Sequence, residues 1–226
     1  MTLRNQFVTM GMAVVTVLLG ACGGAKLSPA AGRAIPTGSG ACAYQTTTAT
    51  ATAQNVGIPP TNPRNTGTAT MRIETGGEAI TVRLYPDKAP CAVGSFAYLA
   101  GKGFFDNTGC HRLTTQGIFV LQCGDPSGTG AGGPTYAYAE ENVDQPYTRG
   151  VVAVANTGQP GSSGSQFFIN YRDNALPPAY TVFGEVIGGL DVVDKVAAGG
   201  DDGSNGAGDG HPNIETKLTR VTVAYG

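Results

Sequence analysis

Two stretches of alternating side chains predict a β-hairpin in the middle of the chain. Residues 68–75 and 78–85 each alternate apolar and polar positions, a pattern typical of strands with one buried face. Gly76 and Gly77 stand between them and can adopt the left-handed backbone that a tight hairpin turn needs. The two stretches are therefore predicted to pair as neighbouring strands of a sheet.

Two other segments carry helical spacing. Residues 89–100 repeat apolar positions on one face, with a proline near the start and Gly101 after the end, and residues 190–198 fit a second helix. Short apolar runs predict further strands at residues 110–115, 118–124, 151–155, 166–170, 181–187 and 217–225. Many short strands with only two helices favour a mainly β fold, a closed antiparallel barrel whose ends the helices cover.

The N-terminal segment predicts export. Residues 1–22 begin with a positive charge at Arg4, continue in a short apolar run and end in Leu19-Gly20-Ala21-Cys22. This ending resembles a bacterial lipobox, in which the cysteine becomes the acylated first residue. We expect a protein anchored by lipid at Cys22 on the cell membrane, facing the envelope or the exterior. An ordinary signal peptide and an uncleaved anchor helix are the alternatives.

Composition divides the rest of the chain into a tether and a domain. Residues 23–67 are rich in Thr, Ala, Pro and Gly and contain few large apolar residues, so they predict a flexible tether. Residues 68–226 are long enough to form one domain with its own core.

Four cysteines remain if Cys22 carries lipid. An even number in an exported protein favours disulfides over metal ligation. Three pairings are open. Neighbouring strands favour Cys110 with Cys123, which leaves Cys42 with Cys91, although adjacent strands can point two side chains to opposite faces.

Charge and several incomplete motifs exclude other functions. A net charge of −2 without a Lys/Arg cluster argues against nucleic acid. Residues 128–133 have the spacing of a dinucleotide-binding turn but no helix follows, and residues 161–165 lack the closing glycine of a nucleophile elbow. The loop 199–210 lacks the ligand order of a calcium loop and is interpreted as a solvated turn, and His211 receives no role. No cofactor or metal is expected.

Five short motifs, in chain order, resemble the cyclophilin family of peptidyl-prolyl cis-trans isomerases. They are Cys110-His111-Arg112-Leu113, the run 119–125, Val154-Ala155-Asn156, the run 164–169 and the run 180–186. The resemblance runs from about residue 69 to 224, and with the lipobox and tether the chain is similar to exported actinobacterial members. It implies an eight-stranded cyclophilin-like barrel capped by two helices. It also implies a monomer that acts on X-Pro bonds of exported or envelope proteins and assists their folding.

Arg112 is the expected catalytic residue. Rotation about an X-Pro bond must break amide conjugation against a barrier of about 18–20 kcal/mol. The prolyl nitrogen regains a lone pair in the twisted transition state, so a guanidinium beside it gains a hydrogen bond that the planar ground state cannot accept well. The alternative is an arginine on a solvated strand face.

The resemblance also assigns substrate-binding residues. Gln122 would steer Arg112, and Asn156 and Gln166 would hold the substrate backbone. Alternation turns Phe168 to the substrate and Phe167 into the barrel. The wall of the proline pocket and its neighbourhood would comprise Phe119, Val120, Ala155, Phe168, Leu176 and Tyr180.

The chain departs from well-known members in three places. Residues 113–118 are two residues longer than the usual turn, which leaves the register between Arg112 and Gln122 open. Ala175 stands where many eukaryotic relatives have a tryptophan that contacts cyclosporin, and Tyr180 replaces a common histidine, so we expect weak cyclosporin binding.

Two other functions are compatible with part of the pattern. One is a proline-peptide binding or chaperone module with incidental turnover. The other is a structural envelope protein that keeps the barrel without the site, against which the set Arg112, Phe119, Gln122 and Phe168 argues.

Overall fold

The computed structural model describes residues 41–226. The predicted signal segment, the lipobox cysteine Cys22 and the first part of the predicted tether lie outside the described residues. Within residues 41–226, no helix has both the length and the apolar character needed to cross a membrane.

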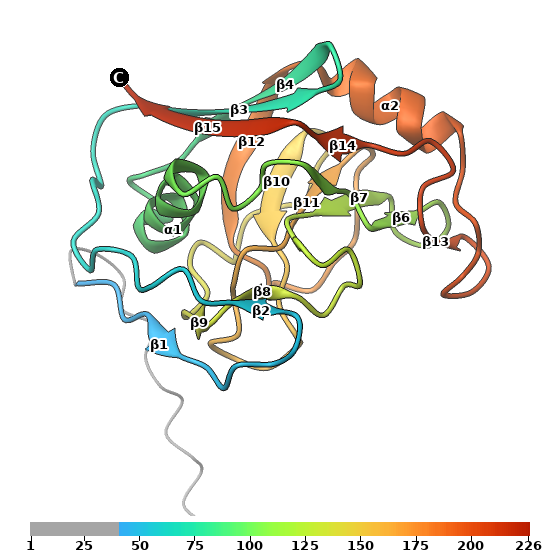
Figure 1. Cartoon of the computed structure of the whole chain (residues 1–226). Coiled ribbons are helices and arrows are strands. Elements are labelled where there is room, and N and C mark those ends of the chain that lie inside the picture. The colour runs from blue at the N-terminus through green and yellow to red at the C-terminus, as the bar shows by residue number, and fades with distance from the viewer. Residues whose placement is uncertain (1–40) are drawn as a thin grey trace, which may run out of the picture. The chain divides into compact units, whose positions relative to one another are not determined.

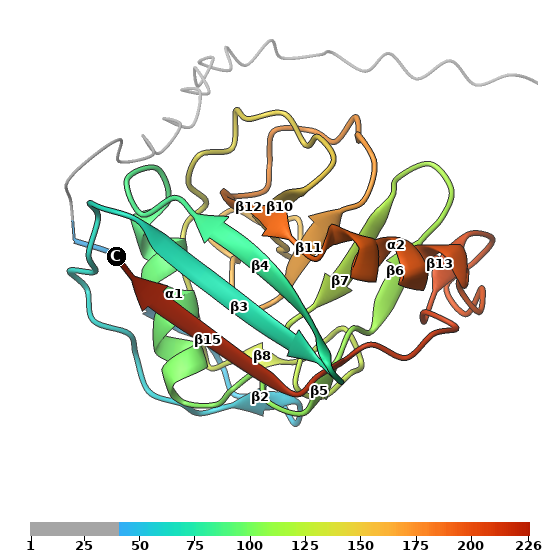
Figure 2. The same ribbon diagram turned by 90° about the horizontal axis from the view of Figure 1, so that it is seen from above.

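One antiparallel sheet forms the body of the domain (Figure 1). Its nine strands in spatial order are β13 (Asp209–Gly210), β6 (Arg112–Thr114), β7 (Val120–Cys123), β11 (Phe167–Asn170), β10 (Val151–Val154), β12 (Val182–Gly188), β4 (Glu78–Leu84), β3 (Ala69–Thr75) and β15 (Arg220–Tyr225). Figure 2 shows β15, β3 and β4 side by side, with α1 (Pro90–Gly101) behind them. The second helix, α2 (Leu190–Ala198), lies at one end of this sheet.

Three pairs of two-residue strands complete the fold. Antiparallel pairs join β1 (Gln45–Thr46) to β9 (Tyr136–Ala137) and β5 (Thr108–Gly109) to β14 (Lys217–Leu218), and a parallel pair joins β2 (Ala53–Gln54) to β8 (Gly133–Pro134).

The hairpin and both helices are confirmed. β3 and β4 pair from Ala69 with Leu84 to Thr75 with Glu78, and Gly76 and Gly77 have φ angles of 61° and 116°. Side chains there would be strained because the left-handed region favours glycine. Local periodicity was therefore a sufficient guide for these elements.

The closed eight-stranded barrel is not shown among residues 41–226. The sheet's strand order ends at β13 and β15, and no ladder joins these two strands. β5 and β14 come directly before β6 and β15 in the chain and pair with each other, and the amide of Cys110 donates to the carbonyl of Thr216 at 3.0 Å. The segments that lead into β6 and β15 therefore contact each other in a separate two-stranded sheet.

Two apolar clusters divide the interior. The larger one packs α1 against the sheet, with Phe96 stacked on Phe105 at a centroid distance of 5.5 Å. The smaller one, named here the site cluster, has as its buried members Val120, Tyr147, Ala153, Phe168 and Val182. Strand alternation sends Phe167 into the larger cluster and Phe168 into the site cluster, as predicted.

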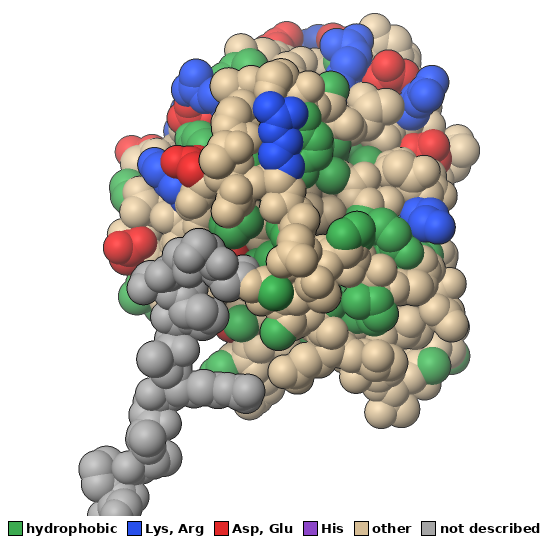
Figure 3. Space-filling model, turned by 90° about the vertical axis from the view of Figure 1, so that its left-hand side faces the viewer, with side chains coloured by type: hydrophobic (Ala, Val, Ile, Leu, Met, Phe, Trp, Pro, Cys, Tyr) green, Lys and Arg blue, Asp and Glu red, His purple; other side chains and the backbone are tan. Residues whose placement is uncertain are grey.

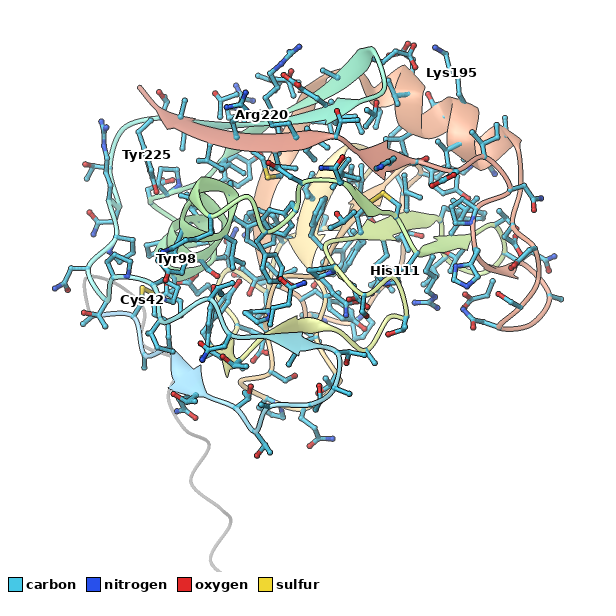
Figure 4. All side chains as sticks on the ribbon, viewed as in Figure 1. Cys42, Tyr98, His111, Lys195, Arg220 and Tyr225 are labelled. Atoms are coloured by element: carbon cyan, nitrogen blue, oxygen red, sulfur yellow. A yellow bond between two sulfur atoms is a disulfide. The ribbon has the colours of Figure 1, made fainter. Side chains whose placement is uncertain are left out.

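Residues 41–67 lie against the domain, although the sequence predicts a flexible tether there. Cys42 is only 2% exposed and forms a disulfide with Cys91 on α1, and the Tyr44 hydroxyl donates to the Cys91 carbonyl at 2.8 Å. Figure 4 shows Cys42 near α1, the helix that carries Cys91. A disulfide and short backbone ladders hold this segment without large apolar side chains, which is why composition misses its packing.

The favoured disulfide pairing is confirmed. Cys42 pairs with Cys91, and Cys110 pairs with Cys123.

On the face shown in Figure 3, Lys and Arg side chains stand singly among acidic and neutral ones.

Candidate active site

Arg112 lies on β6 with its side chain one-third exposed, and Asp209 of β13 holds its guanidinium. The Nε atom donates to Asp209 Oδ1 at 2.8 Å, and Nη2 donates to Oδ2 at 2.5 Å. Such a two-point contact fixes the plane of a guanidinium as well as its position. The sequence-based interpretation of loop 199–210 as a solvated turn therefore misses its functional residue.

The ion pair shifts both groups toward their charged forms. Hydrogen bonding from Arg112 lowers the pKa of Asp209 below its ordinary value, against the opposing effect of burial. Hydrogen bonding to Asp209 likewise raises the pKa of Arg112. Both groups are therefore charged at neutral pH, and the guanidinium is a permanent donor.

A chain of side-chain amides continues from Arg112 across the sheet. Arg112 Nη1 donates to Gln122 Oε1 at 3.4 Å, and Gln122 Nε2 donates to Gln166 Oε1 at 2.8 Å. Gln166 Nε2 in turn donates to the carbonyls of Gly130 and Gly132, each at 2.9 Å. These contacts order the glycine-rich loop 128–133 beside the site.

The register left open by the longer segment 113–118 is settled by β6 and β7. Arg112 pairs directly with Gln122, and Leu113 pairs with Leu121. The extra residues are absorbed in the turn, so the two polar side chains stay neighbours.

The site cluster supplies an apolar surface next to these amides. Phe168 and the half-buried Tyr180 pack edge to face at 5.3 Å, and Tyr147 lies 6.1 Å from Tyr180. The Tyr147 hydroxyl donates to the Tyr180 carbonyl and accepts from the Tyr180 amide, each at 3.0 Å. The half-buried members of the site cluster are Tyr85, Ile118, Val151, Ala155, Leu176 and Tyr180.

Phe119 does not join the other predicted wall residues. It packs against the larger cluster, with its ring 6.0 Å from Tyr171 and with the Arg172 guanidinium 4.9 Å from its centroid. Ile118, two residues before Val120 and just outside β7, packs against the site cluster instead. Sequence alternation counted back from Gln122 points to Ile118 and could have identified it.

Asn156 and Ala155 border the site from the end of β10. Asn156 Nδ2 donates to the Ala179 carbonyl at 2.8 Å, and its Oδ1 accepts from the Gly158 amide at 3.0 Å. The side chain thus fixes the backbone next to Tyr180. The Ala155 amide donates to the Gln166 carbonyl at 2.8 Å.

The disulfide between Cys110 and Cys123 flanks the polar pair of the site, because these cysteines stand within two residues of Arg112 and Gln122.

His111, labelled in Figure 4, is 7% exposed, and neither of its ring nitrogens has a hydrogen-bond partner among the described residues. Burial lowers the pKa of His111, and nearby Asp125 opposes this effect. The imidazole is therefore held neutral.

Comparisons with known proteins relate this chain to one family. The family model described as cyclophilin type peptidyl-prolyl cis-trans isomerase/CLD matches residues 70–223. Proteins described as probable peptidyl-prolyl cis-trans isomerase B are similar, from Mycobacterium leprae at 45% identity and from Mycobacterium tuberculosis at 43%. Each alignment covers 73% of this chain, and the chain spans 59% and 56% of those two relatives.

Solved structures show the same fold. A cyclophilin type isomerase of Cryptosporidium parvum superposes with a TM-score of 0.62 at 28% identity, covering 70% of this chain and 99% of that one. The same protein, solved in the presence of the dipeptide Ala-Pro, gives a TM-score of 0.61 at 27% identity with the same coverage.

Proposed function

The chain belongs to the cyclophilin type peptidyl-prolyl cis-trans isomerase family, and we propose that it interconverts the cis and trans forms of X-Pro bonds in polypeptides. The observation that carries this proposal is the placement of the Arg112 guanidinium beside Gln122, next to the site cluster. A proline ring packed on the cluster would bring its nitrogen to a fixed, charged donor. The structure of the Cryptosporidium relative solved with Ala-Pro supports a proline peptide as ligand.

A charged donor beside an apolar surface can accelerate rotation about an X-Pro bond. A rate gain of roughly 10⁵ requires about 7 kcal/mol of transition-state stabilisation. A hydrogen bond from a charged donor contributes about 1.5–3 kcal/mol in ordinary surroundings. The remainder would come from an apolar, pre-shaped surface that excludes water and strengthens the hydrogen bond.

Each polar residue then has a role of its own. Arg112 donates to the prolyl nitrogen as it becomes pyramidal. Asp209 and Gln122 hold the guanidinium in place, and Gln166 holds Gln122. Asn156 shapes the backbone beside Tyr180, so a substrate would meet its main chain rather than its engaged side-chain amide.

A module that only binds proline peptides is the second candidate, since the site cluster alone could bind proline. A protease-coupled exchange assay on an Ala-Pro-Phe peptide, run with full-length protein purified in detergent and combined with a binding measurement, separates the two. Catalysed exchange supports the isomerase, and binding of the peptide without faster exchange supports the module.

We propose exported or envelope proteins as clients and a lipid anchor at Cys22. The predicted signal segment and lipobox support this location, and two disulfides suit an oxidising compartment. Cell fractionation tests the anchor. The wild-type protein should be found in the membrane fraction and carry lipid, and Cys22→Ala should carry no lipid. Equal lipid modification of both proteins would exclude this anchor.

We also propose that the β5·β14 pair closes the sheet into the barrel that the family resemblance implies. Slow hydrogen exchange at the Cys110 and Asn107 amides, which donate to Thr216 and Leu218, would support closure. Exchange at the rate of exposed loops would contradict it.

We propose a monomer with weak affinity for cyclosporin. Ala175 is exposed and small where an aromatic contact would be needed, and Tyr180 packs against Phe168. Calorimetry should show no submicromolar dissociation constant, and sedimentation should give a single protomer.

A further inference from the structure

A cleft of about 390 Å³ lies beside the active site and is partly built by the N-terminal arm, defined here as residues 41–54. Thr47, Thr48, Thr50 and Ala53 of the arm line it on one side. The other side includes Gln122 and Gln166. Residues distant in sequence thus share one hollow with the polar chain of the active site.

The arm is fixed where it lines this cleft. Ala53 pairs with Gly133 in the parallel β2·β8 ladder, the Thr47 amide donates to the Thr135 carbonyl at 3.0 Å, and Thr52 Oγ1 donates to the Ala131 carbonyl at 3.1 Å. The disulfide of Cys42 ties the beginning of the arm to α1. These contacts make the arm a wall with a defined position.

The cleft is continuous with the active site. Gln122 lines the cleft and accepts the hydrogen bond from Arg112. Ala155 lines the cleft and also packs against the site cluster. A peptide whose proline rests on the site cluster would therefore extend neighbouring residues toward the arm.

The lining determines what the cleft can accept. Its side chains are hydroxyls, amides and small or aromatic groups, and none of the described lining residues is charged. The Glu140 carboxylate, which contacts the lining residue Ser162, already accepts from the amides of Gly161 and Ser162 and from Ser163 Oγ. A charged side chain would therefore lose hydration in the cleft without gaining a free opposite charge, whereas hydroxyl and amide groups would find partners.

We propose that the N-terminal arm selects the residue that flanks the proline of a client polypeptide, because its threonines form one wall of the cleft and favour an uncharged polar side chain there. This inference rests on the proposed function of the neighbouring site. It gives the threonine-rich arm a role in substrate selection.

The test compares Thr48→Trp, which would fill the cleft, with Gln45→Trp on the same arm but outside the cleft lining. Two peptides are used with full-length protein in detergent: a short Ala-Pro-Phe peptide and one with Ser and Thr flanking the same core. Thr48→Trp should lower the ratio of kcat/KM for the flanked over the short peptide at least fivefold, and Gln45→Trp should leave it unchanged. An unchanged ratio in Thr48→Trp would overturn the proposal.

Peptides that differ in their flanking residues provide a second, independent test. Wild-type protein should prefer peptides with Ser, Thr or Asn beside the core over peptides with Glu or Lys, and a preference for charged flanks would overturn the inference. Calorimetric binding of the same peptides distinguishes its failure from that of the proposed function. Tighter binding of the flanked peptide, lost in Thr48→Trp, supports selection by the arm even if no peptide is isomerised.

Discussion

Asp209 binds the guanidinium of Arg112 at two points, with Nε and Nη2 of the arginine donating to its two carboxylate oxygens at 2.8 Å and 2.5 Å. These residues are 97 positions apart in the chain. The pair leaves Nη1 as the nitrogen that contacts Gln122. The loop that ends in β13 therefore determines where the proposed catalytic donor points.

Replacing Asp209 by asparagine should reduce catalysis more than binding. Asp209→Asn removes the charge and one of the two acceptors for the guanidinium, so Arg112 gains freedom to turn away. We expect kcat to fall about five- to tenfold with KM changed less than twofold, because misplacement of a catalytic group acts mainly at the transition state. Asp202→Asn is the matched control, since Asp202 accepts from the Ser204 and His211 amides in the same loop. Equal losses in both variants would contradict a positioning role.

Ile118 and Phe119 form a pair that separates the structure from the sequence-based assignment. Ile118→Ala should lower kcat/KM about fivefold, because a partly buried aliphatic side chain contributes roughly 1 kcal/mol to an apolar contact. Phe119→Ala should keep kcat/KM within twofold and lower Tm, because its ring packs on Tyr171 and the larger cluster. The opposite pattern would restore Phe119 to the proline wall.

The disulfide between Cys110 and Cys123 should support both stability and activity. It closes a loop with a sequence separation of 13 residues, and such a loop contributes about 3 kcal/mol to the free energy of unfolding. The double variant Cys110→Ser/Cys123→Ser should unfold at lower urea concentration and should lose activity, since the bond ties the strands that carry Arg112 and Gln122.

The other disulfide is the control for this effect. Cys42→Ser/Cys91→Ser should lose about 4 kcal/mol of the free energy of unfolding, at least as much as the first double variant, because its sequence separation of 49 residues closes a longer loop, but it should keep turnover of the short peptide. An equal loss of turnover in both double variants would attribute the effect to stability alone.

Acid should destabilise the protein through His111. Its pKa in the folded state is lowered by burial, while the unfolded chain takes up the proton near its ordinary pKa of about 6.5. The unfolded state therefore binds more protons below that pH. The stability contributed by the neutral, buried imidazole is complete above about pH 6.5 and is lost as the pH falls toward the folded-state pKa.

Thermal unfolding at pH 7 and pH 5 measures this contribution. The difference in Tm between the two pH values should be smaller in His111→Gln than in the wild-type protein. His211→Gln, at an exposed position, should keep the wild-type difference. An unchanged difference in His111→Gln would exclude the imidazole as a source of acid sensitivity.

Sequence patterns identify the elements whose signal is local. The β3·β4 hairpin, α1, α2 and the opposite burial of Phe167 and Phe168 follow from periods of two residues or of one helical turn. Arg112, Gln122, Gln166 and Phe168 follow from short motifs, and the structure brings them together.

The remaining features depend on contacts between distant segments. β1, β2 and β13 each contain two residues, too few to show a period. Asp209 meets Arg112 only because β13 pairs with β6, and no local property of a glycine-rich loop predicts that pairing. The packing of the arm comes from a disulfide and backbone ladders, and its composition resembles that of a free linker.

The central claim is that Arg112 stabilises the twisted X-Pro bond, and exchange spectroscopy on an Ala-Pro-Phe peptide tests it most directly. Wild-type protein should accelerate cis-trans exchange, Arg112→Ala should lower kcat/KM roughly 10- to 150-fold, as expected for loss of about 1.5–3 kcal/mol from one charged hydrogen bond, and Arg112→Lys should fall between them. Peptide binding by Arg112→Ala should persist, because the site cluster is intact. Exchange at the wild-type rate in Arg112→Ala would contradict the account.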